Sequence, residues 1–388
     1  MTFRDAIRNL SGLKGLTLIG ASDIIASGIG SAFWFYIASI LASESYGQVS
    51  YFISIASIAS TVSLLGASDT ISVYIPKNVR LESTVYLLTC SIGLVTAIVL
   101  FVMFSNAGIS AYVFGAVIFG LSTSELLARR DYSSYSKYLL IQKALMIGLA
   151  LGLYHIVGVN GILIGIGISF FIYVIRIYHG FKESRINFSL LKERRKFMLN
   201  SYLVNLLSTL SGTVDKIIIL PLVGFEILGN YQLGIQFISV LTILPSIIYK
   251  YILPQDSRGI QNRKLKQYTV LMSIGLAISG IIISPIIIPA LFPKYDESIR
   301  VIQIMSVSVI PTSINLIFAS KFYSTERNIS ILIGTAIYIT SLILFIILLG
   351  KSFGVNGMAT ALVIASVIQS IYYYITDKTN NRRSSSAA

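Results

Sequence analysis

The chain has 388 residues, of which 55% are hydrophobic and 12% are charged, and its mean hydropathy is +0.79. A soluble domain carries about twice that share of charged residues, so the composition excludes a soluble globular protein. The formal net charge of +14 would indicate nucleic-acid binding in a soluble protein, but in a membrane protein it indicates basic loops on one side of the bilayer. We therefore expect no nucleic-acid partner, and the single cysteine, Cys90, excludes a disulfide framework.

Apolar stretches long enough to cross a membrane recur along the whole chain. A helix of about 20 apolar residues spans the hydrocarbon core of a bilayer. The sequence therefore predicts an all-α polytopic membrane protein with about 12 transmembrane helices. In chain order, the expected spans are residues 15–41, 47–66, 83–104, 109–128, 138–157, 159–178, 197–222, 228–250, 268–291, 299–320, 329–350 and 354–376.

Lysine and arginine are distributed unequally between the two sets of loops. If the N-terminus is inside, the inner segments hold 25 of the 30 Lys and Arg residues, and the outer loops hold three. This asymmetry follows the positive-inside rule and supports both the number of spans and their orientation. We expect a multi-pass protein of the cell membrane with both termini cytoplasmic, embedded in the lipid bilayer and without an extramembrane domain.

The two halves of the chain share short motifs at corresponding turns. The sequence GVNG at residues 158–161 recurs at residues 354–357, and a Glu-x-x-Gly pattern at residues 44–47 recurs at residues 226–229. Both pairs indicate a duplication of six spans, and two halves with the same orientation are typical of transporters that bind substrate between them. We expect an N-terminal lobe at residues 1–196, a C-terminal lobe at residues 197–379 and a disordered tail at residues 380–388.

The seventh expected span, residues 197–222, carries a polar stripe on a helix that is otherwise apolar. At about 100° per residue, the stripe consists of Ser201, Asn205, Ser208, Gly212, Asp215 and Lys216. Inside a membrane such a stripe must face protein, water or a substrate. A structural alternative is a salt bridge between helices, formed by Asp215 and Lys216.

The first and fifth spans also carry charged residues. Asp23 shares a helix face with Trp34, the only tryptophan, and Lys143 aligns with Tyr154. A charged group at the centre of a membrane helix costs about 2.5–3.5 kcal/mol or more, so these positions are candidates for function. The structural alternatives are a buried hydrogen bond of Asp23, an ion pair between Asp23 and Lys143, and snorkelling of Lys143 to the inner headgroups.

These residue types indicate binding rather than catalysis. A lysine ammonium can bind phosphate or pyrophosphate, and an aspartate can bind Na⁺ or H⁺ and so couple an ion to a conformational change. We predict substrate-binding roles for Lys143, Lys216, Trp34, Asn205 and Tyr154, and ion-coupling or gating roles for Asp23 and Asp215. The two histidines lack metal-ligand spacing, and no catalytic motif is visible, so we expect neither an enzyme nor a cofactor beyond Na⁺ or H⁺.

Four segments resemble the polysaccharide-transporter branch of the multidrug/oligosaccharidyl-lipid/polysaccharide exporter superfamily: residues 46–77, 212–233, 290–311 and 354–370. The resemblance covers nearly the whole chain and implies a V-shaped fold of two six-helix lobes. It also implies a substrate, an isoprenoid-pyrophosphate-linked oligosaccharide that is moved from the inner to the outer leaflet for glycan-assembly enzymes. The chain departs from the family's cationic cavity, because Lys143 is the main basic residue deep in its first half.

The expected function is therefore that of a flippase for lipid-linked oligosaccharide or polysaccharide repeat units. One alternative is a cation-coupled exporter of drugs or toxins, which would need a smaller, more aromatic and more acidic cavity. Another alternative is a non-transporting membrane subunit of a glycan-synthesis complex. A membrane glycosyltransferase is the least favoured alternative, since the outer loops are short and carry no catalytic set of charged residues.

Overall fold

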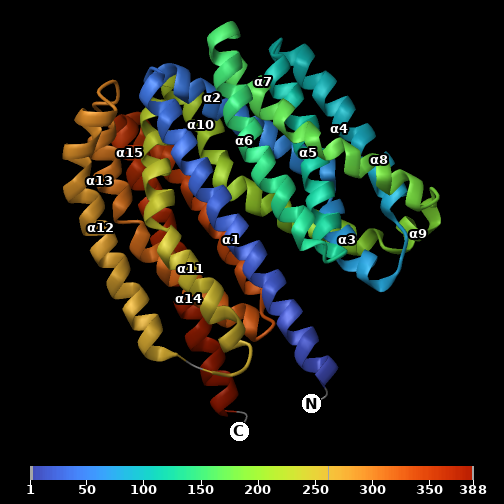
Figure 1. The fold of residues 1–388 in the computed structure, drawn as a ribbon. Helices are drawn as coiled ribbons and strands as arrows, with labels where there is room; N and C mark the ends of the chain where they lie inside the picture. Colours follow the sequence, from blue (N-terminus) through green and yellow to red (C-terminus); the bar gives the residue numbers. More distant parts are fainter. Residues whose placement is uncertain (1–2, 261, 387–388) are drawn as a thin grey trace. The chain divides into compact units, whose positions relative to one another are not determined.

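The computed structural model describes residues 3–260 and 262–386, and within these ranges it contains helices and no strands (Figure 1). The elements are α1 (Phe3–Ile40), α2 (Ser43–Leu64), α3 (Ala67–Tyr74), η1 (Ile75–Lys77), α4 (Glu82–Phe104), α5 (Ala107–Ala128), α6 (Tyr132–Val157), α7 (Val159–Ser169), η2 (Phe170–Tyr173), α8 (Val174–Glu183), α9 (Phe188–Glu193), α10 (Arg195–Leu241), α11 (Ile243–Asp256), α12 (Arg263–Leu291), α13 (Ser298–Ser306), α14 (Val309–Ser324) and α15 (Asn328–Ser386).

Ten helical segments of the described residues are long and apolar enough to cross a membrane. One of them, α15, contains two of the expected spans, and α10 contains the seventh expected span and the first part of the eighth, which continues in α11. The backbone of α10 is non-helical at Gly224 (φ 83°, ψ 177°), and that of α15 is non-helical at Gly354 (φ 58°, ψ −139°). Each long helix is therefore two helices joined at a glycine, since side chains disfavour these dihedral angles. The structure confirms an all-α polytopic membrane protein with about 12 spans.

The repeated GVNG sequence forms the same turn twice. Gly158, between α6 and α7, has φ 72° and ψ −150°, close to the values of Gly354. A Cβ atom on Gly161 would overlap with the carbonyl oxygen of Leu153, and one on Gly357 would overlap with that of Leu349. All three pairs are 196 residues apart, so the duplication that the sequence indicates is also present in the backbone.

The chain divides into two compact units. Unit 1 consists of residues 1–33 and 52–209, and unit 2 consists of residues 34–51 and 210–388. These units differ from the lobes that the sequence predicts, because the segment Trp34–Tyr51 packs within unit 2 and residues 197–209 pack within unit 1. The boundary after residue 196 stays a prediction. The structure continues α15 to Ser386. The disordered tail at residues 380–388, of which the last two lie outside the described residues, stays a prediction.

In unit 1, α5 lies at the centre and contacts α3, α4, α7 and α8. Its buried face packs with neighbouring helices around large fully buried side chains, among them Tyr86, Leu121 and Tyr173. In unit 2, α12 contacts α13 and α14, while α15 contacts α13 and α14. Tyr231, Met305 and Met358 are fully buried in the core of unit 2. Each unit thus has its own apolar core.

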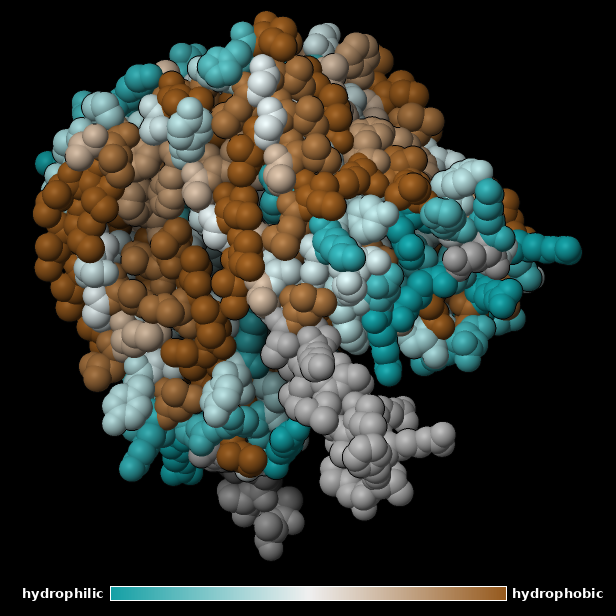
Figure 2. Space-filling model, in the orientation of Figure 1, coloured by the Kyte–Doolittle hydropathy of each residue, from teal (hydrophilic) through white to brown (hydrophobic). Residues whose placement is uncertain are grey.

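Each unit is largely hydrophobic along its helices, and hydrophilic residues gather near helix ends. Figure 2 shows hydrophilic residues around α8 and α9 in unit 1, and around the connection between α11 and α12 in unit 2. In unit 1, the buried carboxylate of Glu125 accepts hydrogen bonds from Tyr86 (2.9 Å) and pairs with Arg129 (2.8 Å). By the predicted orientation, these ends face the inner side of the membrane.

The two Glu-x-x-Gly motifs meet inside unit 2. A Cβ atom on Gly47, in α2, would overlap with the carbonyl oxygen of Phe225, and one on Gly229, in α10, would overlap with that of Ser43. The backbones of the two helices are therefore in direct contact, which only glycine allows at this distance. Aromatic rings pack beside this crossing, with Tyr46 and Tyr295 6.1 Å apart between ring centroids.

Candidate functional site

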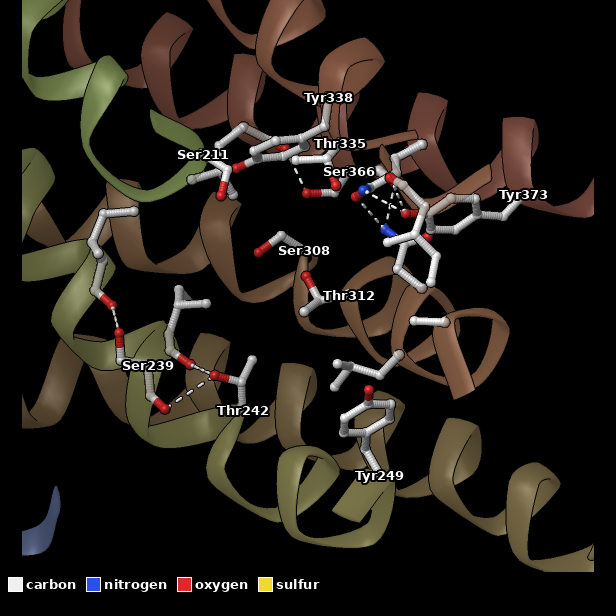
Figure 3. A pocket seen from close by; sticks show the side chains of 18 of the residues that line it. Ser211, Ser239, Thr242, Tyr249, Ser308, Thr312, Thr335, Tyr338, Ser366 and Tyr373 are labelled. Carbon is white, nitrogen blue, oxygen red and sulfur yellow. Dashed lines mark hydrogen bonds between the residues drawn. The ribbon is translucent and has the colours of Figure 1, made fainter. Parts of the chain in front are cut away.

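Unit 2 contains a partly open cavity of about 500 Å³ (Figure 3). It lies among α10, α11, α14 and α15, and both arms of α10 contribute to its lining. None of its lining residues is Asp, Glu, Lys, Arg or His. Thirteen of them are polar and uncharged: Ser211, Ser239, Thr242, Tyr249, Ser308, Thr312, Asn315, Tyr323, Thr335, Tyr338, Ser366, Gln369 and Tyr373.

Two helices supply most of the polar lining through residues at helical spacing. Ser308 precedes α14, and Thr312 and Asn315 follow on the same helix face. Ser366, Gln369 and Tyr373 form a second polar stripe on α15. Residues three or four positions apart lie above one another on a helix, so each stripe faces the cavity over about two turns.

Hydrogen bonds between the two stripes hold the amide side chains in place. The Asn315 amide donates to the Gln369 side-chain oxygen (2.9 Å) and to the Ser366 carbonyl (3.2 Å). The Gln369 amide in turn donates to the Tyr373 hydroxyl (3.2 Å). This network connects α14 with α15 and fixes which donors and acceptors line the cavity.

Ser308 differs from these neighbours because its hydroxyl has no hydrogen-bond partner among the described residues. The residue is 0% exposed, and its side chain faces the cavity in Figure 3. A buried hydroxyl without a partner costs about 1–3 kcal/mol. The Ser308 hydroxyl is thus a polar group that a ligand in the cavity can satisfy.

Two residues predicted from the sequence, Asp215 and Lys216, form a buried ion pair within α10. The Lys216 Nζ lies 3.3 Å from the Asp215 Oδ1 and donates to the Gly212 carbonyl (2.7 Å). The Tyr231 hydroxyl donates to the other carboxylate oxygen (2.9 Å). Tyr231 follows the kink at Gly224, so this bond joins the two arms of α10. The pair is intrahelical, unlike the salt bridge between helices that the sequence suggested as the structural alternative.

The remaining predicted residue of unit 2, Trp34, contacts Tyr46 edge to face, with ring centroids 6.3 Å apart. It lies outside the cavity lining, as do Asp215 and Lys216. None of the three residues of unit 2 for which the sequence predicts a role therefore lines its cavity.

In unit 1, Asp23 is half-buried and accepts a hydrogen bond from the Tyr135 hydroxyl (2.9 Å). Next to this bond, the Ser136 hydroxyl donates to that of Ser22 (3.0 Å), so α1 and α6 are joined twice. Lys143 lies eight residues beyond Tyr135 on α6. Its half-buried ammonium has no ion pair or hydrogen bond among the described residues, so Asp23 and Lys143 do not pair.

The two other predicted residues of unit 1 occupy separate places. The Asn205 amide donates to the Asp69 carboxylate (3.0 Å), which joins α10 to α3. Tyr154 is half-buried near the end of α6, beside His155. The structure thus divides the seven predicted residues between two units and does not bring those of either unit into one cluster. Their roles stay predictions.

Sequence reasoning missed the cavity because it searched for charged groups. A usable signal was present, since Ser308, Thr312 and Asn315 recur at helical spacing inside an apolar span, as do Ser366, Gln369 and Tyr373. The same criterion of a polar stripe had singled out residues 197–222. Uncharged polar residues at that spacing are weaker evidence than an intramembrane aspartate, because they can donate to their own helix.

Comparison with known proteins gave no match among protein-family models and none among curated sequences. Solved structures do match. The chain is similar to the lipid II flippase MurJ in an inward closed conformation, with a TM-score of 0.76 and 15% identity over 93% of this chain and 87% of that chain. The chain shares the fold of this flippase.

Further solved structures support this assignment of the fold. An inward-facing multidrug resistance transporter of the MATE family matches with a TM-score of 0.66 and 15% identity, over 92% of this chain and 94% of that chain. An outward-facing MATE transporter matches with a TM-score of 0.61 and 13% identity, over 95% of each chain. These neighbours are transporters, which confirms at the level of fold the resemblance found in the sequence.

Proposed function

We propose that the protein is a flippase that moves lipid-linked oligosaccharide or polysaccharide repeat units from the inner to the outer leaflet by alternating access. The observation that carries this proposal is the cavity of unit 2, in which thirteen of the nineteen lining residues carry a hydroxyl or amide group and none carries a carboxylate. Sugar hydroxyls both donate and accept hydrogen bonds, so a lining of this chemistry suits a glycan. The likeness in fold to a lipid II flippase supports the same substrate class.

The substrate we propose is an isoprenoid-pyrophosphate-linked oligosaccharide, whose lipid tail stays in the bilayer during transfer. Glycan-assembly enzymes would supply it on the inner side. Lys143 is the residue that we propose for its anionic group, because a half-buried ammonium without a partner among the described residues is available to phosphate. Trp34, Asn205 and Tyr154 are proposed to contact the substrate along its path.

The proposed coupling residues have different surroundings. Asp23 keeps one carboxylate oxygen outside its bond to Tyr135, so it can bind Na⁺ or H⁺. Asp215 and Lys216 are paired and buried, and we propose that they act as a gate whose ion pair changes between the two states of the cycle. Lys216 would then contact substrate in the state in which the pair is open.

A cation-coupled multidrug exporter is the second candidate, and the likeness in fold to MATE transporters favours it. Such an exporter would need acidic groups around its substrate, and the cavity of unit 2 offers none. A non-transporting subunit of a glycan-synthesis complex is a third reading, which transport by the purified chain alone would exclude.

Reconstitution of the full-length protein into proteoliposomes tests the proposal. A fluorescent polyisoprenyl-pyrophosphate disaccharide is placed in the membrane, and an impermeant quencher measures how much of it reaches the opposite leaflet. We expect transfer well above that of protein-free liposomes. Transfer at the protein-free rate would contradict the flippase, and ethidium efflux by the same preparation would support the multidrug exporter instead.

A further inference from the structure

We propose that the cavity of unit 2 binds uncharged sugar residues of the translocated glycan and excludes acidic ones. This inference rests on the proposed function, since it names the part of the substrate that this cavity holds. It adds a binding site centred on Ser308 and Thr312, two residues for which the sequence analysis predicts no role. Four observations carry it: the size of the cavity, its donors and acceptors, its lack of charge and its place along the helices.

The size of the cavity suits a small ligand. Binding pockets for small molecules usually have volumes of about 300–1,000 Å³, and the cavity has about 500 Å³. It is partly open, so a sugar at the end of a longer glycan can enter while the rest stays outside. Six apolar residues line the cavity beside the thirteen polar ones, so a sugar bound there meets both hydrogen-bonding groups and apolar surface.

The donors and acceptors of the lining match a polyhydroxylated ring. Serine and threonine hydroxyls can rotate to donate or accept, which suits sugar hydroxyls of varied orientation. The Ser308 hydroxyl is buried and has no partner among the described residues, so binding would supply the hydrogen bond that this group lacks. Three tyrosines, Tyr249, Tyr323 and Tyr338, add flat apolar faces against which a sugar ring can pack.

The absence of charge sets the specificity. No lining residue carries a charge that could neutralise a carboxylate or phosphate on the sugar. Burying an ionised group without a counter-charge is strongly unfavourable, whereas neutral hydroxyls exchange water for protein hydrogen bonds. A uronic acid or phosphorylated sugar would therefore be rejected, and the anionic pyrophosphate must lie outside this cavity.

The place of the cavity fits a substrate that arrives from the inner leaflet. In the predicted orientation, Ser308 and Tyr338 lie in the middle of their spans, while Tyr249 and Tyr323 lie at the inner ends. The lining thus runs from the inner side to about half the depth of the membrane. A terminal sugar would bind there before transfer.

Protection of an engineered cysteine tests the site directly. The full-length protein is placed in lipid nanodiscs with Cys90→Ser and Thr312→Cys, and the rate of maleimide labelling is measured. The probes are the neutral disaccharides chitobiose, lactose and maltose, and the acidic disaccharide cellobiouronic acid. We expect at least one neutral disaccharide to slow labelling about tenfold at saturation, and the acidic one to leave it unchanged. Equal protection by the acidic probe, or none by any neutral probe, would overturn the proposal.

Matched variants test the same site during transport. Ser308→Ala combined with Thr312→Val removes two hydroxyls from the lining with little change in volume. The control is Ser313→Ala, since Ser313 is buried on the same helix and its hydroxyl donates to the Val309 carbonyl instead of lining the cavity. We expect about tenfold slower flipping of a neutral lipid-linked disaccharide by the double variant and an unchanged rate for the control.

The two experiments separate the site from the function. If the wild-type protein flips the lipid-linked disaccharide and the folded double variant flips it equally fast, the sugar site is wrong while the flippase stands. If neutral sugars protect the cysteine but the protein flips no lipid-linked disaccharide, the sugar site is supported and the proposed flippase function is wrong. Gel-filtration profiles of both variants show whether they are folded.

Discussion

Replacing Lys216 with methionine is expected to destabilise unit 2, because it leaves the Asp215 carboxylate buried without its counter-charge. The two side chains are 8% and 5% exposed, so water cannot solvate the remaining charge. Removing one partner from a buried ion pair typically costs about 3–5 kcal/mol. The Tyr231 hydroxyl still donates to the carboxylate, and a hydrogen bond to a charged group is worth about 1.5–3 kcal/mol, so we expect a cost near the lower end, about 3 kcal/mol.

The double replacement Asp215→Asn with Lys216→Met should recover most of this loss. The asparagine side chain keeps an oxygen that can accept from Tyr231, and neither residue is then charged. Replacing a buried pair by neutral groups of similar volume is often close to neutral in stability. We expect the double variant to lie within about 1 kcal/mol of the wild type, so the second replacement should recover about 2 kcal/mol of the stability that Lys216→Met loses.

Unfolding in detergent by guanidinium measures these differences, and the chain supplies its own probe. Trp34 is the only tryptophan and belongs to unit 2, so its fluorescence reports on the unit that contains the ion pair. Circular dichroism of the same samples follows the helices of both units. Wild-type stability of the Lys216→Met variant, or a double variant as unstable as the single one, would refute the reasoning from burial.

Flipping by the double variant then separates the structural role of the pair from the proposed gate. A folded double variant that flips at the wild-type rate would show that Asp215 and Lys216 only stabilise α10. A folded double variant that does not flip would support gating, because the charges would then be needed for the cycle and not for the fold.

Three further predictions concern other parts of the molecule. Gly229→Ala should lower the free energy of unfolding of unit 2 by more than about 1 kcal/mol, because the added Cβ overlaps with the Ser43 carbonyl. Gly212→Ala has nothing within 4 Å of the added atom and should be neutral or stabilising. Unfolding of the two variants in guanidinium measures the difference. Tyr135→Phe removes the hydrogen bond to Asp23 and should lower the free energy of unfolding by about 1 kcal/mol. If Asp23 binds the coupling ion, the same variant should shift the Na⁺ or pH dependence of flipping, and an unchanged dependence would argue against that role. Lys143→Ala should reduce flipping at least tenfold at normal membrane abundance while Lys143→Arg keeps part of it, and normal flipping by the alanine variant would remove Lys143 from the site.

Much of the fold could be predicted from the sequence, because the bilayer imposes simple rules on length and hydrophobicity. The spans follow from apolar stretches, and the duplication follows from two GVNG turns whose glycines are required by their dihedral angles. The membership of the compact units could not be predicted. The segment Trp34–Tyr51 packs with the second half of the chain through contacts such as that between Gly229 and Ser43. These contacts join residues far apart in the sequence, so no local sequence pattern predicts them.

The candidate site was less predictable than the fold for a related reason. A charged residue in a predicted span implies a free-energy cost of burial, but the sequence does not show which residue pairs with it and reduces that cost. Asp23 pairs with Tyr135 and not with Lys143, and Lys216 pairs with its sequence neighbour Asp215. The cavity around Ser308 consists of uncharged residues, which carry little cost and therefore give little signal in a single sequence.

The crossing of Gly47 and Gly229 has a consequence for how this chain can vary. The two glycines occupy equivalent places in the two copies of the repeat, so their contact resembles an isologous interface, in which one surface meets a second copy of itself. In a symmetric dimer one codon would specify both residues, and any substitution would act twice. In this single chain two codons specify them separately, so each side of the contact can be changed alone and the two halves are free to become different.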